Sequence, residues 1–337
     1  MKLKQIMLDH GSGGLASQEL IEKLFLRYLD HPLLADMEDS AVFSVPGTRL
    51  AMSTDSYVVD PLFFPGGDIG QLAVHGTIND LAMRGARPLY LSLAFILEEG
   101  LSYGELEKII RSIAQASKDA AVPIITGDTK VVERGKADKI FINSTGLGVV
   151  APDCQISLTR ARPGDKIIIS GPMGDHGLTI MSQRSGLSLS GDLASDTMPL
   201  HGLVEQLLDE FGPAIHTLHD PTRGGVATGL NEIASHSKVA LEIMEAALPI
   251  RPQVAAGCEI LGLDPLYLAN EGKVLIFVAA DKAQGLLNLA HSRPEGREAA
   301  IIGQVQEGPA GRVSLITAIG GSRLLTPLQG QPLPRIC

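Results

Sequence analysis

Apolar runs of strand length alternate with amphipathic segments of helix length along this chain, in two successive stretches. In the first stretch this pattern predicts helices at 17–29, 68–84 and 102–119 and strands at 49–53, 89–97, 122–126 and 139–150. In the second stretch it predicts helices after 171–177 and at 200–211, 224–235, 252–261 and 281–292, and strands at 166–170, 214–218, 239–243, 274–279, 299–305 and 312–317. Such alternation buries one face of each element in packed layers, so we expect an α+β or α/β fold.

The chain is expected to divide into three segments. At 337 residues it is too long for one small core, and the turn-rich sequence RARPG separates the two stretches. We therefore expect an N-terminal domain over 1–160 and a C-terminal domain over 161–325. Residues 326–337 (TPLQGQPLPRIC) hold three prolines and show no periodicity, which predicts an extended, flexible tail. Thirteen residues from Leu325 span roughly 40 Å when fully extended, enough to carry Cys337 into a distant cleft.

Composition and charge exclude several classes of protein. Net charge is −10 and Lys and Arg form no long basic run, so nucleic-acid binding is not expected. No stretch approaches the ~20 apolar residues of a membrane span, and the N-terminus lacks the apolar core of a signal peptide. The three cysteines, Cys154, Cys258 and Cys337, are odd in number and widely spaced, which argues against a disulfide framework or a cysteine zinc site. The expected compartment is the cytoplasm.

Acidic residues stand at the ends of predicted elements, namely Asp39, Asp55, Asp80 and Asp128. Asp55 and Asp128 follow apolar strands, where loops commonly build sites. Mg²⁺ prefers oxygen ligands and usually binds one or two carboxylates together with phosphates. Lys130, two residues after Asp128, could place a positive charge on a phosphate. Two interpretations stay open: a shared metal–phosphate site, or separate turn and cap aspartates.

Glycine-rich stretches could offer backbone N–H groups to a phosphate. They are GSGG, with Gly11, Ser12, Gly13 and Gly14; GPMGDHG at 171–177; and HDPTRGG, with Asp220, Thr222 and Arg223 before a predicted helix. Most short glycine clusters are only turns, and HDPTRGG could equally be a helix N-cap with an exposed arginine.

Two further residues could take part in chemistry. Glu271, in NEGK before the apolar run VLIFVAA, could be a general base or a solvated loop residue. Cys337 ends a proline-rich arm, and a thiol on a tether is suited to carrying a covalent group. Its neighbour Arg335 is expected to favour the thiolate. A terminal cysteine can also be incidental.

Seven motifs spread over the chain are HGSGG (10–14), STDSYVVDPLFFPGG (53–67), TGDTKVV (126–132), SGPMGDHG (170–177), DPTRGG (220–225), NEGK (270–273) and PRIC (334–337). In this combination, and above all in ending on PRIC, the chain closely resembles the HypE family of hydrogenase maturation factors. That family lies in the superfamily of aminoimidazole ribonucleotide synthetase, selenophosphate synthetase and thiamine-monophosphate kinase. The resemblance implies two α+β domains, with the N-terminal domains pairing as a homodimer around a shared β-barrel.

The resemblance also implies ligands and site residues. ATP would bind with Mg²⁺ held by Asp39, Asp55, Asp80 and Asp128, and Lys130 would contact the phosphates. The nucleotide would also contact residues of the matching motifs, which are Gly11, Ser12, Gly13, Gly14, Thr54, Asp55, Gly127, Asp128, Thr129, Asp220, Thr222 and Arg223.

The implied activity is an ATP-dependent dehydration of an S-carboxamide on Cys337 to a thiocyanate, with Glu271 as base. The partner HypF would load the carbamoyl group, and the HypC–HypD complex would receive the cyanide as an iron ligand of [NiFe] hydrogenase. The alternatives are a superfamily synthetase or kinase acting on a free small molecule, and a nucleotide-binding scaffold. Deleting residues 336–337 separates them, because only the dehydratase would lose its reaction.

Overall fold

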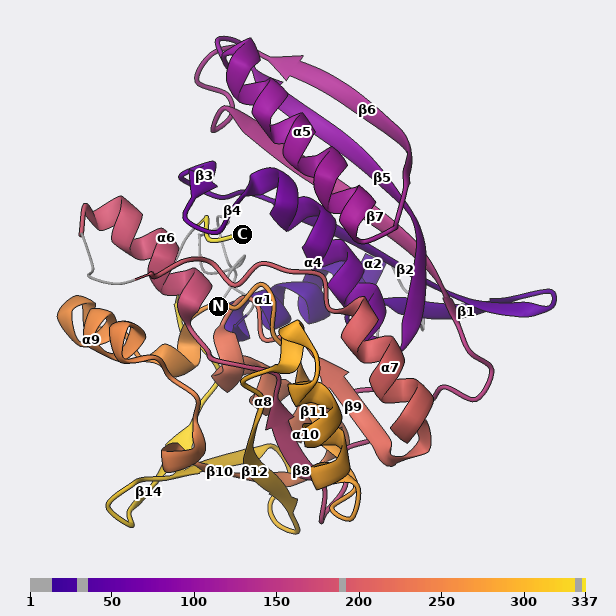
Figure 1. Cartoon of the computed structure of the whole chain (residues 1–337), viewed down its shortest axis with the longest axis vertical. Helices are drawn as coiled ribbons and strands as arrows, with labels where there is room; N and C mark the ends of the chain where they lie inside the picture. The colour runs from indigo at the N-terminus through magenta and orange to yellow at the C-terminus, as the bar shows by residue number, and fades with distance from the viewer. Residues whose placement is uncertain (1–13, 29–35, 188–191, 331–334) are drawn as a thin grey trace.

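A computed structural model describes residues 14–28, 36–187, 192–330 and 335–337 (Figure 1). Its N-terminal half is built on a five-stranded sheet with the order β1-β2-β7-β5-β6. The strands are β1 (Ala41–Val45), β2 (Thr48–Tyr57), β5 (Ala86–Glu98), β6 (Ile124–Val132) and β7 (Ile140–Val150). Neighbouring strands are antiparallel except β5 and β6, which are parallel. A small pair, β3 (Phe63–Phe64) and β4 (Gly67–Asp68), leads into the first long helix.

Helix α4 (Ile69–Met83) is the central element of the molecule. It contacts β2, β5 and β7 of the first sheet, and α7 and β9 of the second half. Its glycines allow this: a Cβ on Gly76 would lie 2.4 Å from the Tyr57 hydroxyl, and one on Gly70 would lie 2.8 Å from Ile113. Helix α5 (Tyr103–Asp119) packs beside α4 on the same face of the sheet (Figure 1). Glycine at these two positions therefore lets α4 pack closely against Tyr57 and α5.

The C-terminal half is built on a seven-stranded sheet with the order β14-β13-β10-β12-β8-β11-β9. Its strands are β8 (Lys166–Ile169), β9 (Ile215–His219), β10 (Ala240–Met244), β11 (Leu275–Val278), β12 (Ala300–Gln306), β13 (Arg312–Ile316) and β14 (Ser322–Leu325). Only the pair β10–β13 is parallel among these contacts.

Helices cover both faces of the second sheet. Helix α8 (Gly225–Ser237) lies on one face, and α7 (His201–Phe211) and α10 (Ala283–His291) lie on the other. Helices α6 (Asp175–Ser185) and α9 (Pro252–Leu261) pack against each other and join the apolar core of the first half. Strand β8 shows why: Ile167 and Ile169 pack in the core with α8, whereas Ile168 packs in the core with α7 and α10. Alternate residues of a strand point to opposite faces, so a strand that is apolar throughout is buried on both.

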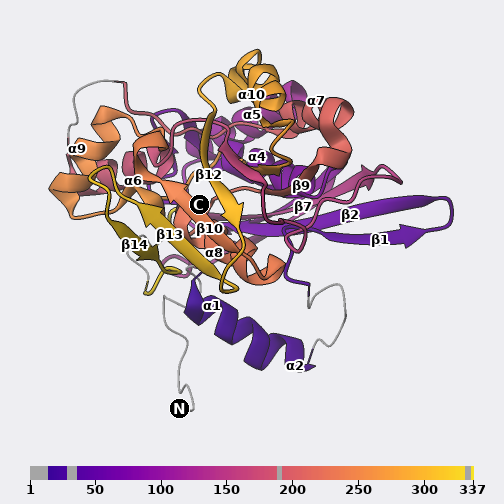
Figure 2. The same ribbon diagram turned by 90° about the horizontal axis from the view of Figure 1, so that it is seen from below.

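Short elements complete the described chain. At the N-terminus α1 (Leu15–Leu20), a π-helical turn η2 (Ile21–Phe25) and α2 (Leu26–Tyr28) form one rod at the edge of the molecule (Figure 2). Single 3₁₀ turns are η3 (Gly212–Ala214), η4 (Glu245–Ala247), η5 (Pro265–Tyr267) and η6 (Pro294–Gly296). Both views show β1 and β2 projecting as a hairpin from the body. Within the described residues, no helix has the length and apolar character needed to cross a bilayer.

Several predicted elements are confirmed, and others need correction. The helix predicted at 102–119 is confirmed as α5, and Ser102 caps it by accepting a hydrogen bond from the backbone N–H of Glu105 at 3.1 Å. Two strands run further than predicted: β2 continues through Asp55 to Tyr57, and β6 continues to Val132. The helix predicted at 17–29 begins earlier than expected, because α1 starts after Gly14 and Ser17 is buried inside it. Strands β1 and β14 were not predicted. The mixed α/β, two-domain class is confirmed, and the domain limits stay a prediction.

Candidate active site

A polar pocket of about 220 Å³ lies where α4 meets both halves of the molecule. Four aspartates converge on it from separate elements. Asp39 precedes β1, Asp55 is in β2, Asp80 is in α4 and Asp220 follows β9. The lining also includes Ser53, Thr54, Tyr57, Gly76, Thr222, Arg223, Glu271 and Cys337. Three of the four predicted metal ligands therefore meet here, together with Asp220 from HDPTRGG.

Two of these aspartates, Asp80 and Asp220, have raised pKa values. Burial raises the pKa of Asp80 well above its usual value, and the charges of Asp220, Asp55 and Asp39 raise it further. Burial and the charge of Asp39 raise the pKa of Asp220 to about 7. The Ser53 hydroxyl donates a hydrogen bond to Asp80 at 2.6 Å, which offsets part of this effect. Carboxylates held this close and this dry repel one another unless a cation joins them.

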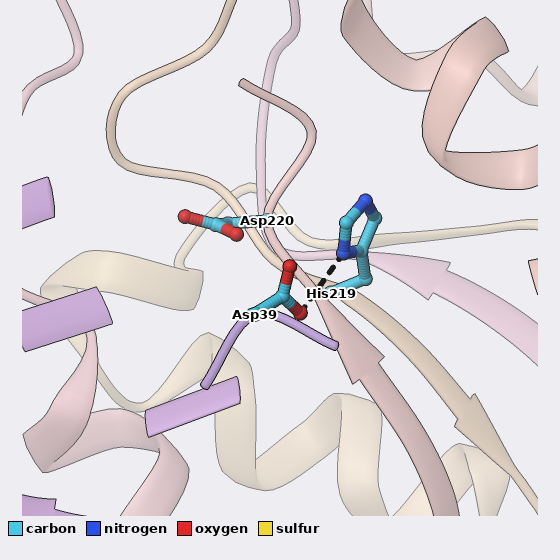
Figure 3. A group of neighbouring side chains, drawn as sticks. All are labelled: Asp39, His219 and Asp220. Atoms are coloured by element: carbon cyan, nitrogen blue, oxygen red, sulfur yellow. Dashed lines mark hydrogen bonds and ion pairs between the residues drawn. The ribbon is translucent and has the colours of Figure 1, made fainter. Parts of the chain in front are cut away.

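His219 lies beside this group and is itself held by two carboxylates. Its Nδ1 is 3.0 Å from Asp39 Oδ2, and its Nε2 is 3.3 Å from Glu232 Oε2. Burial lowers the pKa of His219, but the charges and hydrogen bonds of Asp39 and Glu232 outweigh it and raise the pKa well above the usual value. Asp39, His219 and Asp220 can bring ligand atoms within 4.8 Å of one another (Figure 3). Sequence reasoning missed His219, although it is the first residue of HDPTRGG.

The donor set fits a hard divalent cation. Mg²⁺ prefers carboxylate oxygens, and the pocket supplies several of them with a net negative charge. The imidazole of His219 is already bound between Asp39 and Glu232, so the available ligands are oxygen atoms.

The C-terminal residue Cys337 lies in this same pocket of its own chain, with Glu271 and Arg223. Burial raises the pKa of the Cys337 thiol well above its usual value, and the charge of Glu271 raises it further, whereas Arg223 lowers it. The expectation that Arg335 would favour the thiolate is wrong. The Arg335 guanidinium pairs instead with Asp138 at 2.8 Å and Asp60 at 3.4 Å.

Glu271 is buried, 3% exposed, beside the thiol. Burial raises its pKa well above the usual value, and the charges of Asp196, Asp220 and Asp55 raise it further. Its Oε1 has no hydrogen-bond partner among the described residues. A carboxyl group in this state is available to take or give a proton to a group placed next to Cys337.

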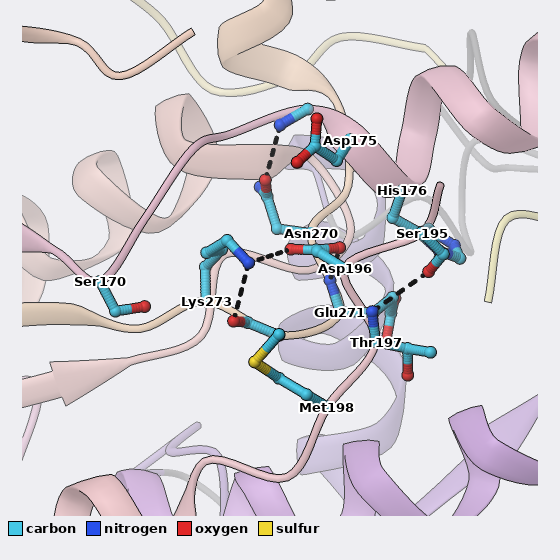
Figure 4. Close-up of polar contacts among 12 residues, drawn as sticks. Ser170, Asp175, His176, Ser195, Asp196, Thr197, Met198, Asn270, Glu271 and Lys273 are labelled. Carbon is cyan, nitrogen blue, oxygen red and sulfur yellow. Dashed lines mark hydrogen bonds and ion pairs between the residues drawn. The ribbon is translucent and has the colours of Figure 1, made fainter. Parts of the chain in front are cut away.

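A buried ion pair behind Glu271 holds its loop (Figure 4). Lys273 Nζ is 3.0 Å from Asp196 Oδ2, with both side chains about 5% exposed or less. Asp196 also accepts a hydrogen bond from the backbone N–H of Glu271 at 3.0 Å. A Cβ on Gly272 would lie 1.9 Å from the carbonyl oxygen of Asp196, so the loop fits only with glycine there. Sequence reasoning missed Asp196, which no motif marks.

An asparagine ties this loop to the helix that carries Asp80. The Asn79 side chain donates to the carbonyl of Met198 at 3.1 Å and accepts from the N–H of Leu200 at 2.8 Å. It also approaches the Glu271 carbonyl at 3.5 Å. Asp80 and Glu271 therefore have a fixed relation although they belong to different halves.

Other predicted site residues lie elsewhere in the single chain. Gly127, Asp128, Thr129 and Lys130 lie on the exposed strand β6, where Lys130 Nζ pairs with Asp128 at 3.1 Å. Gly11, Ser12 and Gly13 fall outside the described residues, and Gly14 packs against the carbonyl of Leu328. In GPMGDHG, Gly174 N–H donates to Asn270 at 2.8 Å, so that N–H is engaged within the protein.

Comparison with known proteins places this geometry among related chains. Residues 37–150 match the model of the AIR synthase related protein N-terminal domain, and 162–316 match its C-terminal domain. The carbamoyl dehydratase HypE of Azotobacter vinelandii is 53% identical over 98% of this chain and 97% of its own length.

Two solved structures are similar over almost the whole chain. One is a hydrogenase maturation protein HypE in complex with ATP, 54% identical, with a TM-score of 0.84 over 99% of this chain and 100% of that one. The other is a HypE–HypF complex, 47% identical, with a TM-score of 0.87 over 92% of this chain and 99% of that one.

Proposed function

The chain belongs to the carbamoyl dehydratase HypE family, and from this premise we propose that it uses ATP to dehydrate an S-carboxamide on its own Cys337 to a thiocyanate. The observation that carries the proposal is the position of Cys337. It lies with Glu271 and Arg223 in a buried pocket of converging aspartates. A substrate group on that sulfur would stand beside both a phosphate-binding cation site and a buried base.

The chemistry balances as a loss of water coupled to ATP cleavage. The carboxamide oxygen attacks the γ-phosphorus and ADP leaves, which converts a poor leaving group into phosphate. The amide nitrogen loses its two protons and the C–O bond breaks, giving S–C≡N and inorganic phosphate. Arg223, 3.7 Å from Asp55 and next to Cys337, is placed to neutralise charge on the transferred phosphoryl group.

Glu271 is the proposed base for the amide protons. Burial raises the pKa of its carboxyl well above that of a solvated glutamate, so its ionised form is a stronger base. Its Oε1 has no partner in the described part of the chain, which leaves an acceptor position next to the sulfur. The loop held by Asp196 and Lys273 keeps that acceptor in place.

Asp39, Asp55, Asp80 and Asp220 are the residues that would hold Mg²⁺ in this pocket. Bound there, Mg²⁺ would offset negative charge on the phosphate oxygens of ATP. The raised pKa values of Asp80 and Asp220 support this, because they arise from burial and from the charges of neighbouring carboxylates, and a bound cation would offset both.

A homodimer is proposed for the outer face of the five-stranded sheet. Tyr90 and Ile96 of β5 are 44% and 43% exposed there, and Met52 of β2 is 47% exposed. Lys130 pairs in register with Ile96 on this face, and Asp128 pairs with Ala94. Closing two such sheets into a barrel would cover the apolar face and place Asp128 and Lys130 at the joint, within reach of a nucleotide.

The partners follow from the proposed chemistry and from the HypE–HypF complex of a relative. We propose that HypF loads the carbamoyl group onto Cys337 and that HypC–HypD receives the cyanide. The cytoplasm is the proposed compartment, since the substrate ATP and a free thiol both belong there.

Intact mass spectrometry of the C-terminal peptide tests the function. The chain is incubated with HypF, carbamoyl phosphate and ATP, and then given buffer with or without Mg²⁺ and ATP. A carbamoyl adduct on Cys337 should lose one water only when both are present. Cys154→Ser is the matched thiol control and should keep the reaction, whereas Cys337→Ser should lose it. An unmodified Cys337 with active HypF would overturn the proposal.

A further inference from the structure

The last three residues are bound to a defined surface rather than merely tethered near the pocket. The backbone N–H of Val58 donates to the terminal carboxylate of Cys337 at 2.9 Å, and the N–H of Asp60 donates to the carbonyl of Arg335 at 3.3 Å. The two contacts hold alternate residues, 335 and 337, while Arg335 itself has a left-handed backbone with φ of +51°. They fix the register of the tail, so that the residue reaching the pocket is the terminal one.

The intervening residue, Ile336, is bound through both its side chain and its backbone carbonyl. Its side chain is 5% exposed and belongs to the apolar core that includes Phe64 and Leu178. Its carbonyl lies 2.7 Å from Nε2 of the buried His176, and Nδ1 of that ring lies 2.8 Å from the Ser195 hydroxyl. Burial lowers the pKa of His176, so the neutral ring donates from Nε2 and accepts from Ser195.

Arg335 supplies a charged anchor at the entrance. Its guanidinium pairs with Asp138, in the turn between β6 and β7, at 2.8 Å, and with Asp60 at 3.4 Å. The Arg184 guanidinium donates to the carbonyl of Arg335. These contacts, with those of Val58 and His176, make up a tail-binding surface that recognises a basic, an aliphatic and a terminal cysteine residue in order.

We propose that this tail-binding surface is a sequence-specific peptide-binding site that also accepts a separate peptide ending in Arg-Ile-Cys. The inference rests on the proposed dehydratase function for its catalytic consequence. Its physical basis is independent of that function, because the contacts described above are made by residues 335–337 themselves. A second copy of this protein, or a synthetic peptide, would be bound by the same contacts.

The first experiment measures binding alone. In the full-length chain, Ile336→Asp places a charge in the apolar site and releases its own tail. A fluorescent peptide of residues 326–337 is then titrated by anisotropy up to about 5 mM, above the millimolar effective concentration that a short tether supplies. Saturable binding is expected. A peptide with Ala in place of Ile336 should bind about 30-fold more weakly through lost apolar burial.

Charge contacts are tested on both sides of the interface. A peptide with Ala in place of Arg335 should bind about threefold more weakly and lose its salt dependence, as expected for an exposed ion pair. Asp138→Asn in the protein should weaken binding by less, because Asp60 still pairs with Arg335 at 3.4 Å, and it should add nothing to the loss caused by Ala in place of Arg335. Arg323→Ala, which removes another exposed arginine paired with Asp264 at 2.9 Å, is the matched control and should leave binding unchanged.

The second experiment measures chemistry with the same peptide carrying an S-carboxamide. Water loss from the peptide is expected with Mg²⁺ and ATP, with KM following the order of the binding constants. Binding without water loss from either the peptide or the chain's own tail would overturn the dehydratase and leave the peptide site standing. Water loss from the intact chain, with no peptide binding or with equal binding of all peptides, would overturn the peptide site.

Discussion

Replacing Lys273 by methionine tests whether the ion pair behind Glu271 is a structural support. The substitution keeps the length and apolar stem of the side chain but removes the charge that lies 3.0 Å from Asp196. In the described part of the chain, Asp196 would keep the N–H of Glu271 as its donor. Removing one member of a buried ion pair costs about 3–5 kcal/mol, because the other charge stays buried without compensation.

The pH dependence of this loss has a definite sign. In the native chain, burial raises the pKa of Asp196. The charge of Lys273 and the hydrogen bond from the Glu271 N–H lower this pKa by more than burial raises it, so the pKa lies below the usual value. The pair therefore stabilises above the unfolded pKa, about 3.9, and that stability is lost as pH falls through the folded pKa. In Lys273→Met the burial effect dominates and the Asp196 pKa rises. The difference between variant and parent should be greatest at neutral pH and should shrink in acid.

Urea unfolding at pH 7 and pH 5 measures these free energies. Asp196→Asn, alone and combined with Lys273→Met, completes a double-mutant cycle, and the double variant should recover part of the loss. Arg323→Ala is the control for an exposed pair, for which at most about 1 kcal/mol is expected. A loss under about 1 kcal/mol in Lys273→Met, or a loss independent of pH, would refute the argument.

Three other outcomes follow from the pocket and the sheet. Glu271→Gln should bind ATP normally but slow water loss at least about 100-fold in the mass-spectrometric assay, and an unchanged rate would exclude it as the base. The pKa of Asp220, about 7, is above its unfolded value, so without metal the stability of the fold should fall as pH rises from about 4 to 7. Thermal unfolding in EDTA should show this fall. Mg²⁺ should reverse the fall, and Asp220→Asn should lessen it. Tyr90→Asp should turn a dimer into monomers in analytical ultracentrifugation, whereas the exposed Tyr103→Asp should not, and a parent chain that is already monomeric contradicts the proposed barrel.

Much of the fold was predictable because its signals are local. Period and capping identify α5 through Ser102, and the glycine-containing pattern of α4 ends at Gly85, whose φ is +65°. The end of β6 was harder to predict from the sequence. Thr129, Val131 and Val132 are β-branched and continue the strand, so Asp128 lies inside β6 rather than in a loop beyond it.

The site was partly predictable for a different reason. Asp39, Asp55 and Asp80 could be grouped because each stands near an element end in a polar motif, and the glycine-rich stretch HDPTRGG marked Asp220 as a candidate phosphate-binding residue. The ion pair of Asp196 with Lys273 joins positions 77 residues apart (273 − 196), and no local sequence pattern marks it. Contacts of that kind are decided by how two layers pack, which only the folded chain reveals.

Helix α4 is the floor of the pocket and is part of the cores of both halves. A hinge needs two bodies that can move apart, and α4 joins the two halves because it packs in the cores of both. Enzymes that handle ATP often close a lid over a waiting substrate. Here the catalytic groups would stand still, and the mobile component would be the reactant, travelling on its own tether. Each chain would then process one carbamoyl group per loading of Cys337. The rate at which carbamoyl groups are supplied, rather than the opening of a lid, would limit turnover.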